Sequence, residues 1–115
     1  MRLYIAGPMN GYPDYNFPLF FKVEQELSKT YDIINPARIA LDTFNKNCLQ
    51  EIPREVFLRL DIQYLLICEG IVLLPRWEKS NGAILERLIA KELKFAIYNY
   101  LGNGRIKSEE TCNNF

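Results

Sequence analysis

The chain has 115 residues, of which 49% are apolar and 24% are charged, a composition typical of one globular domain. Its 14 basic and 14 acidic side chains give a formal net charge of zero, which argues against a nucleic-acid polymer as partner, because such binding needs a basic surface. No apolar run reaches the length of a membrane span, and we expect neither a secretory leader nor a membrane anchor.

The elements are predicted from hydrophobic patterning and from turn residues. Strands are predicted over residues 2–7, 31–35, 70–75 and 95–100. Helices are predicted from an Asn16 cap through Leu27, over 53–68 and over 83–94. The segment 36–51 has no clear period, so we expect a long loop there with at most a turn of helix.

Strands that alternate with helices predict an α/β fold: a single-domain Rossmann-like (flavodoxin-like) parallel sheet with helices on both faces. We assign residues 1–100 to this domain and expect 101–115 to be a flexible C-terminal tail. In such sheets the ligand binds beyond the carboxyl ends of the strands. Here those ends carry the loops 7–16, 36–51 and 76–82.

Two acidic residues occupy helix positions where apolar residues are expected. On a helical wheel Glu86 falls among the apolar residues of its helix, and Asp61 does the same on the preceding helix. Buried carboxylates without partners are rare, so each is predicted to open into a polar pocket. Two such carboxylates suit glycoside chemistry. The alternative is a pair of structural residues at helix ends or in ion pairs with arginines.

The loop before Glu86 has the features of an anion site. Ser80 is predicted to cap the helix, and Asn81-Gly82 lets the backbone approach a ligand, so free amides could bind a phosphate. Ser caps are usually only structural, and a single tryptophan at a strand end usually packs, although Trp77 also offers a surface for a base to stack on. Gly7-Pro8 predicts a tight turn, and it indicates a substrate-binding loop only when other site residues point to the same place.

The cysteines indicate the cellular compartment, and the absence of histidine limits which catalytic groups are available. Cys48, Cys68 and Cys112 are widely spaced and odd in number, so we expect free thiols in a reducing, cytoplasmic compartment. The chain has no histidine, which removes the usual catalytic imidazole and most zinc sites. Acid–base chemistry is left to carboxylates, Lys, Tyr or Cys, and we expect no metal and no organic cofactor.

Several short motifs resemble the nucleoside 2-deoxyribosyltransferase superfamily, and most closely a compact branch found in bacteria and phages, close to the 2′-deoxynucleoside 5′-phosphate N-hydrolases. The similar segments are YIAGPM at 4–9, Asp61 followed by Glu69 and GIVLLP, and Ser80 with Gly82 and Glu86. The resemblance covers roughly residues 2–97. Arg76 departs from it, because the branch usually has Gly there, and Arg76 would add a phosphate contact or narrow the pocket.

The resemblance implies roles for individual residues. The Glu that matches Glu86 attacks the anomeric carbon, the Asp that matches Asp61 orients it and the sugar, and the Tyr that matches Tyr4 lies near the nucleophile. A Ser at the position of Ser80 is typical of hydrolases of 5′-monophosphates. The resemblance further implies substrate contacts from Gly7, Pro8, Met9, Ser80, Asn81, Gly82 and Trp77.

The function expected from these observations is hydrolysis of the base–sugar bond of a (deoxy)nucleoside 5′-monophosphate, with Glu86 as nucleophile. The alternatives are base exchange between deoxynucleosides, a non-catalytic nucleotide-binding module, and an interaction protein that has kept only the fold. The expected partner is a small nucleotide or nucleoside. The resemblance also implies a homodimer or larger homo-oligomer, in a bacterial cytoplasm or in the host cytoplasm if a phage encodes it.

Overall fold

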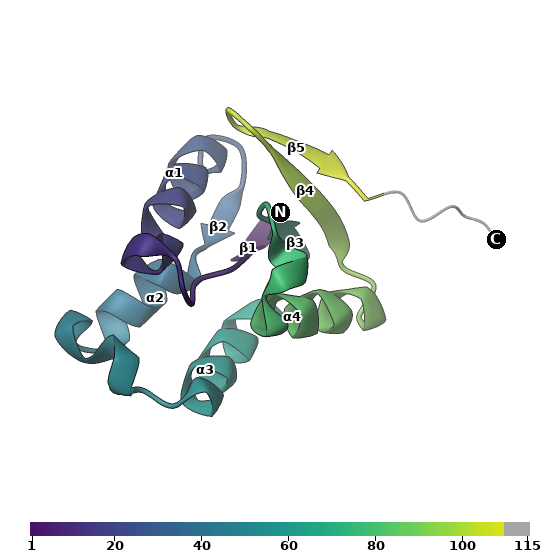
Figure 1. Cartoon of the computed structure of the whole chain (residues 1–115). Coiled ribbons are helices and arrows are strands. Elements are labelled where there is room, and N and C mark those ends of the chain that lie inside the picture. The colour runs from purple at the N-terminus through teal and green to yellow at the C-terminus, as the bar shows by residue number, and fades with distance from the viewer. Residues whose placement is uncertain (110–115) are drawn as a thin grey trace.

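The computed structural model describes residues 1–109, which form a five-stranded sheet in the order β2-β1-β3-β4-β5 (Figure 1). The parallel strands are β1 (Arg2–Ala6), β2 (Asp32–Ile34), β3 (Gly70–Leu73) and β4 (Ala96–Gly102), and β5 (Arg105–Ser108) pairs antiparallel with β4. The order of the parallel strands and the helices between them make this a flavodoxin-like sheet. The predicted fold class is therefore confirmed.

Four α-helices and three short 3₁₀ helices connect the strands. The α-helices are α1 (Phe17–Leu27), α2 (Pro36–Thr43), α3 (Arg54–Leu66) and α4 (Asn81–Glu92), and the 3₁₀ helices are η1 (Pro13–Asn16), η2 (Lys46–Glu51) and η3 (Trp77–Lys79). In the core, α1 packs against one face of the sheet, while α3 and α4 pack against the other.

The alternation of side chains along β1 separates the two cores. Leu3 and Ile5 point to the α1 face, and Tyr4 and Ala6 point to the face covered by α3 and α4. All four are buried, as expected for a central strand of a parallel sheet. The register of β1 therefore places the hydroxyl-bearing Tyr4 under the helix that carries Glu86.

The segment 36–51 is helical, which corrects the predicted long loop. Asn35 caps α2, because its side-chain oxygen accepts a hydrogen bond of 2.9 Å from the backbone N–H of Ala37. Pro36 occupies the first helical position, where its fixed φ and missing N–H are tolerated. Pro36 therefore both follows β2 and begins α2. The Asn35-Pro36 pair indicates the start of this helix, which the hydrophobic pattern alone does not show.

The predicted flexible tail is also corrected within the described residues. β4 continues to Gly102, and residues 105–108 pair with it as β5. The hairpin is attached to α1, since one carboxylate oxygen of Glu26 accepts from the Tyr100 hydroxyl at 2.7 Å and from the Gly104 N–H at 2.9 Å. The rest of the predicted tail and Cys112 lie outside the described residues. Cys48 and Cys68 are free thiols.

Large apolar side chains are exposed on α3, directly after it and on α4: Val56, Tyr64, Leu66, Ile67, Ile84 and Leu88. The homo-oligomer that the resemblance implies stays a prediction. None of the helices in residues 1–109 has both the length and the apolar composition needed to span a membrane.

Arg76 adopts a left-handed backbone conformation, with φ of 67°, immediately before η3. Side chains with a Cβ are disfavoured there by roughly 1–2 kcal/mol, whereas glycine adopts the same angles freely. A glycine at this position would therefore adopt the observed backbone angles without this cost.

We therefore expect Arg76→Gly to raise the free energy of unfolding by about 1 kcal/mol, as measured by chemical denaturation. Lys91→Gly is the matched control, because Lys91 is an exposed basic residue inside α4. That change should lower the free energy of unfolding by about 1 kcal/mol. A loss of stability in Arg76→Gly of the same size would contradict the argument.

Candidate active site

Glu86 is the one buried carboxylate among residues 1–109, with 6% of its surface exposed. It lies on the buried face of α4, one turn from Ala83 and one turn from Ala90. The Tyr4 hydroxyl, which comes up from β1, donates a hydrogen bond of 2.5 Å to Glu86 Oε2. The inward position predicted for Glu86 is confirmed, and Tyr4 is its direct partner.

Burial changes the protonation of both carboxyl groups. Burial, the largest cause, and the nearby Asp61 together raise the pKa of Glu86 from 4.5 to about 8, although the Tyr4 hydrogen bond acts to lower it. Burial also raises the pKa of Asp61 from 3.8 to about 7. The pKa of Tyr4 is raised well above 10 by burial and by the two carboxylates, so the hydroxyl keeps its proton and remains a donor.

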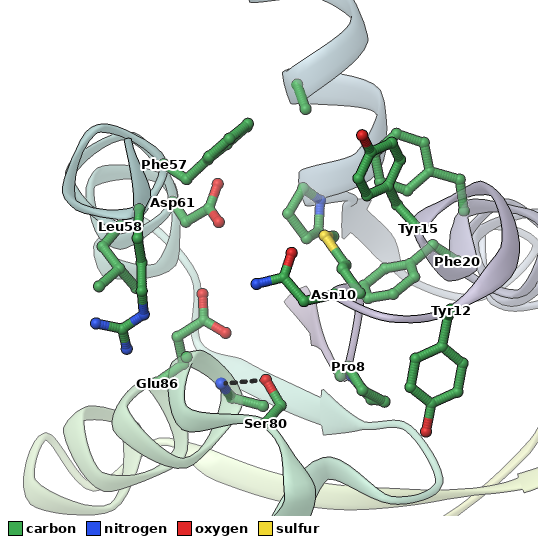
Figure 2. A pocket seen from close by; sticks show the side chains of 18 of the residues that line it. Pro8, Asn10, Tyr12, Tyr15, Phe20, Phe57, Leu58, Asp61, Ser80 and Glu86 are labelled. Carbon is green, nitrogen blue, oxygen red and sulfur yellow. Dashed lines mark hydrogen bonds between the residues drawn. The ribbon is translucent and has the colours of Figure 1, made fainter. Parts of the chain in front are cut away.

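Glu86 and Asp61 open into one cavity of about 560 Å³ at the carboxyl ends of β1 and β3. In Figure 2 both carboxyl groups point into this space, Asp61 from α3 and Glu86 from α4. The predicted site residues that line it are Tyr4, Gly7, Pro8, Met9, Asp61, Ser80, Asn81, Gly82 and Glu86. The fold thus brings together three segments that the sequence had suggested separately.

The beginning of α4 forms one end of this cavity. The Ser80 hydroxyl accepts a hydrogen bond of 3.2 Å from the N–H of Ala83, so the predicted cap is confirmed (Figure 2). Asn81 and Gly82 form the first turn of the helix, two residues earlier than predicted, and their N–H groups have no earlier helical carbonyl to bind. Lys79 lines the same end and adds a positive charge.

Two expectations about the loop before α4 are wrong. Trp77 does not line the cavity: it packs against the core beneath α3 and α4, and the Arg87 guanidinium lies 5.1 Å from the centre of its ring. Arg76 is exposed and does not line the cavity either. Trp77 begins the three-residue helix η3, and Arg76 is the residue before it.

α3 provides a wall of the cavity that was not predicted from the sequence. Arg54, Phe57 and Leu58 line the cavity together with Asp61. These four residues are spaced three, four and seven apart, so they share one face of a helix. Asp61 alone had been singled out on this helix, and the same spacing could have identified the other three.

A second missed wall is aromatic and comes from the loop after β1 and from α1. Tyr12, Tyr15, Phe17 and Phe20 line this side (Figure 2 labels Tyr12, Tyr15 and Phe20). Leu49, Gln50 and Ile52, from η2 and the residue after it, also line the cavity, and Gln50 contacts this wall because its Oε1 accepts the Tyr15 hydroxyl at 3.3 Å. Composition alone could not place these side chains, because the prediction gave residues 36–51 no structure.

The loop 7–16 is held in an unusual shape. Asp14, Tyr15 and Asn16 all have positive φ, at 51°, 55° and 61°. Asn16 does not cap α1 with its side chain as predicted; its amide donates to the Pro8 carbonyl at 2.9 Å. The loop also starts tightly, because a Cβ at Gly7 would lie 2.8 Å from Leu74 Cβ.

No group of three or more metal-ligating side chains occurs in the described part of the chain. The groups that line the cavity are two carboxyl groups, three phenols, the Ser80 hydroxyl, amides and two basic side chains. A cavity of this kind can hold a polar ligand of nucleotide size with an anionic group at the α4 end.

The raised pKa of Glu86 predicts how stability depends on pH. The folded state binds the proton more tightly than the unfolded state, so this stabilisation is complete below pH 4.5 and is lost as the pH rises through about 8. A tenfold change in proton affinity is worth about 1.4 kcal/mol. We expect the free energy of unfolding of the native chain to fall by on the order of 2–4 kcal/mol more than that of Glu86→Gln between pH 5 and pH 9.

Thermal or chemical unfolding across this range measures the difference. Glu92→Gln is the matched control, because Glu92 is an exposed residue of the same helix. Its pH dependence should follow that of the native chain. Parallel curves for the native chain and Glu86→Gln would show that Glu86 is ionised in the folded state at neutral pH.

The chain has no match among curated proteins. Residues 1–99 match the family model DUF4406, which is described as a domain of unknown function. This match spans every element from β1 to the middle of β4, and with it all the residues that line the cavity. The chain belongs to the DUF4406 family.

Proposed function

We propose that this protein is an N-glycosidase that hydrolyses the base–sugar bond of a (deoxy)nucleoside 5′-monophosphate, with Glu86 as nucleophile. The observation that carries the proposal is the pair of inward carboxyl groups, Glu86 and Asp61, in one cavity whose other end is the capped start of α4. The similarity of the YIAGPM and Ser80–Glu86 segments to the nucleoside 2-deoxyribosyltransferase superfamily supports the same reaction. We also propose a cytoplasmic location.

In this proposal Glu86 attacks the anomeric carbon and forms a glycosyl ester, which water then hydrolyses. Tyr4 holds the attacking carboxyl in place through its 2.5 Å hydrogen bond and favours the ionised form. Asp61 faces the same space, orients the sugar, and stabilises the positive charge that develops at C1′. The Ser80 hydroxyl, the free amides of the first turn and Lys79 bind the 5′-phosphate.

Glu86→Gln tests the proposed nucleophile. The amide keeps the shape and can still accept the Tyr4 hydrogen bond, but it cannot attack C1′. We expect release of free base to fall by on the order of 10³-fold or more while nucleotide affinity is retained. The measurement is chromatography of a panel of nucleoside monophosphates after incubation, with Glu92→Gln as an active control. Undiminished turnover by Glu86→Gln would rule out this mechanism.

The same assay separates the alternatives. With a free acceptor base added, a new nucleoside in place of free sugar phosphate would indicate base exchange. A non-catalytic nucleotide-binding module would release no base from any nucleotide of the panel, although nucleotides would still raise its melting temperature. An interaction protein that has kept only the fold would show neither effect.

Ser80 tests the preference for a phosphate. Asp caps a helix as well as Ser does, so Ser80→Asp should keep the fold while it places a negative charge at the proposed phosphate position. Two like charges 4 Å apart near a protein surface repel by about 4 kcal/mol. We expect kcat/KM for the 5′-monophosphate to fall by on the order of 10²–10³-fold, and that for the free nucleoside to change little.

Ser28→Asp is the matched control, since it adds the same charge at an exposed position that follows α1, away from the cavity. It should leave both substrates unaffected. If Ser80→Asp lowers kcat/KM for nucleoside and nucleotide equally, the start of α4 does not bind the phosphate.

A further inference from the structure

Asn10 faces the two carboxyl groups from the opposite side of the cavity. It belongs to the loop that follows β1, it is exposed, and it lines the same cavity as Glu86 and Asp61. In Figure 2 its carboxamide projects across the open space toward both carboxyl groups, with no hydrogen bond drawn to it. Its N–H donors and its carbonyl oxygen are therefore available to a ligand that lies between the two walls.

Few other hydrogen-bond donors surround Asn10. The adjacent wall of the cavity is apolar or aromatic and includes Met9, Phe17 and Phe20. The other side-chain donors on that side are the Tyr12 hydroxyl and the Nε2 group of Gln50, whose Oε1 accepts the Tyr15 hydroxyl at 3.3 Å. A negative charge that developed on a ligand here would be poorly stabilised without a donor, and the Asn10 amide is directed into this space.

The direction of attack determines which part of the substrate meets Asn10. A nucleophile displaces a leaving group from the opposite face of the carbon, so the base must lie on the side of C1′ away from Glu86. Asn10 projects from that side. Purines and pyrimidines both have an acceptor next to the glycosidic nitrogen, N3 in purines and O2 in pyrimidines.

We propose that the Asn10 carboxamide donates a hydrogen bond to this acceptor and stabilises the base as it leaves, an inference that rests on the proposed function. As a Glu86 oxygen bonds to C1′, the C1′–N bond breaks and its electron pair passes to the base. The base takes a proton from water, and the hydroxide of that water hydrolyses the glycosyl ester and regenerates the Glu86 carboxylate. Negative charge develops on the base as the bond breaks and remains until the base is protonated, so the hydrogen bond is stronger in the transition state than in the bound substrate.

A comparison of leaving groups tests this role. Asn10→Ala removes the amide, and Asn10→Leu keeps nearly the same shape without a donor or a charge. With a pyrimidine deoxynucleoside 5′-monophosphate we expect both variants to lose about 10²-fold in kcat, with nucleotide affinity little changed. With 4-nitrophenyl deoxyribose 5′-phosphate, whose leaving anion is stable by itself, the loss should be below about 3-fold.

Asn47→Ala is the control, because Asn47 is an exposed amide of η2 that does not line this cavity. It should match the native chain on both substrates. Equal losses on the two substrates, or no loss on either, would overturn the role of Asn10 and leave the proposed function intact. If the native chain releases neither base nor nitrophenol, the proposed function itself fails, and the role of Asn10 fails with it.

Discussion

The hydrogen bond between Tyr4 and Glu86 joins the centre of the sheet to the helix above it, and the architecture of the site depends on it. Tyr4 is fully buried on β1, and its hydroxyl would be an unsatisfied donor in the core if Glu86 were apolar. Glu86 in turn would be a buried carboxyl without a donor. Each group therefore makes the burial of the other tolerable, and together they set the position of α4 over β1.

This arrangement changes the protonation of the two carboxyl groups. Burial moves the pKa of Glu86 to about 8 and that of Asp61 to about 7, so both groups are partly neutral near physiological pH. A structural ion pair would have the opposite effect, because a neighbouring cation lowers a carboxyl pKa. Arg87, the nearest candidate in sequence, instead pairs with Glu109 and lies over Trp77. The structure thus argues against the ion-pair alternative for Glu86.

What the sequence could predict depended on whether a residue's role was local. The apolar runs of β1 and β3 and the odd placing of Glu86 and Asp61 were visible from periodicity. The Asn35-Pro36 start of α2 was a local signal that was interpreted only as a strand end. Trp77 is different, because its direction is set by η3 and by Arg87, and neither follows from hydrophobic pattern. The cavity wall made by η2 and the loop 7–16 could not be predicted without the tertiary fold, because three residues of that loop adopt positive φ.

Under the proposed function, the raised proton affinity of the two carboxyl groups serves both binding and catalysis. Because both groups are partly neutral, their negative charge is reduced beside the cations Lys79 and Arg54, and an anionic phosphate can enter. A carboxylate formed in this poorly hydrated position is destabilised until a positive charge develops close to it. The sugar carbon acquires such a charge only as the glycosidic bond breaks. The interaction of Glu86 and Asp61 with the substrate is therefore stronger in the transition state than in the bound complex, which is the condition for it to accelerate the reaction and not merely to tighten binding.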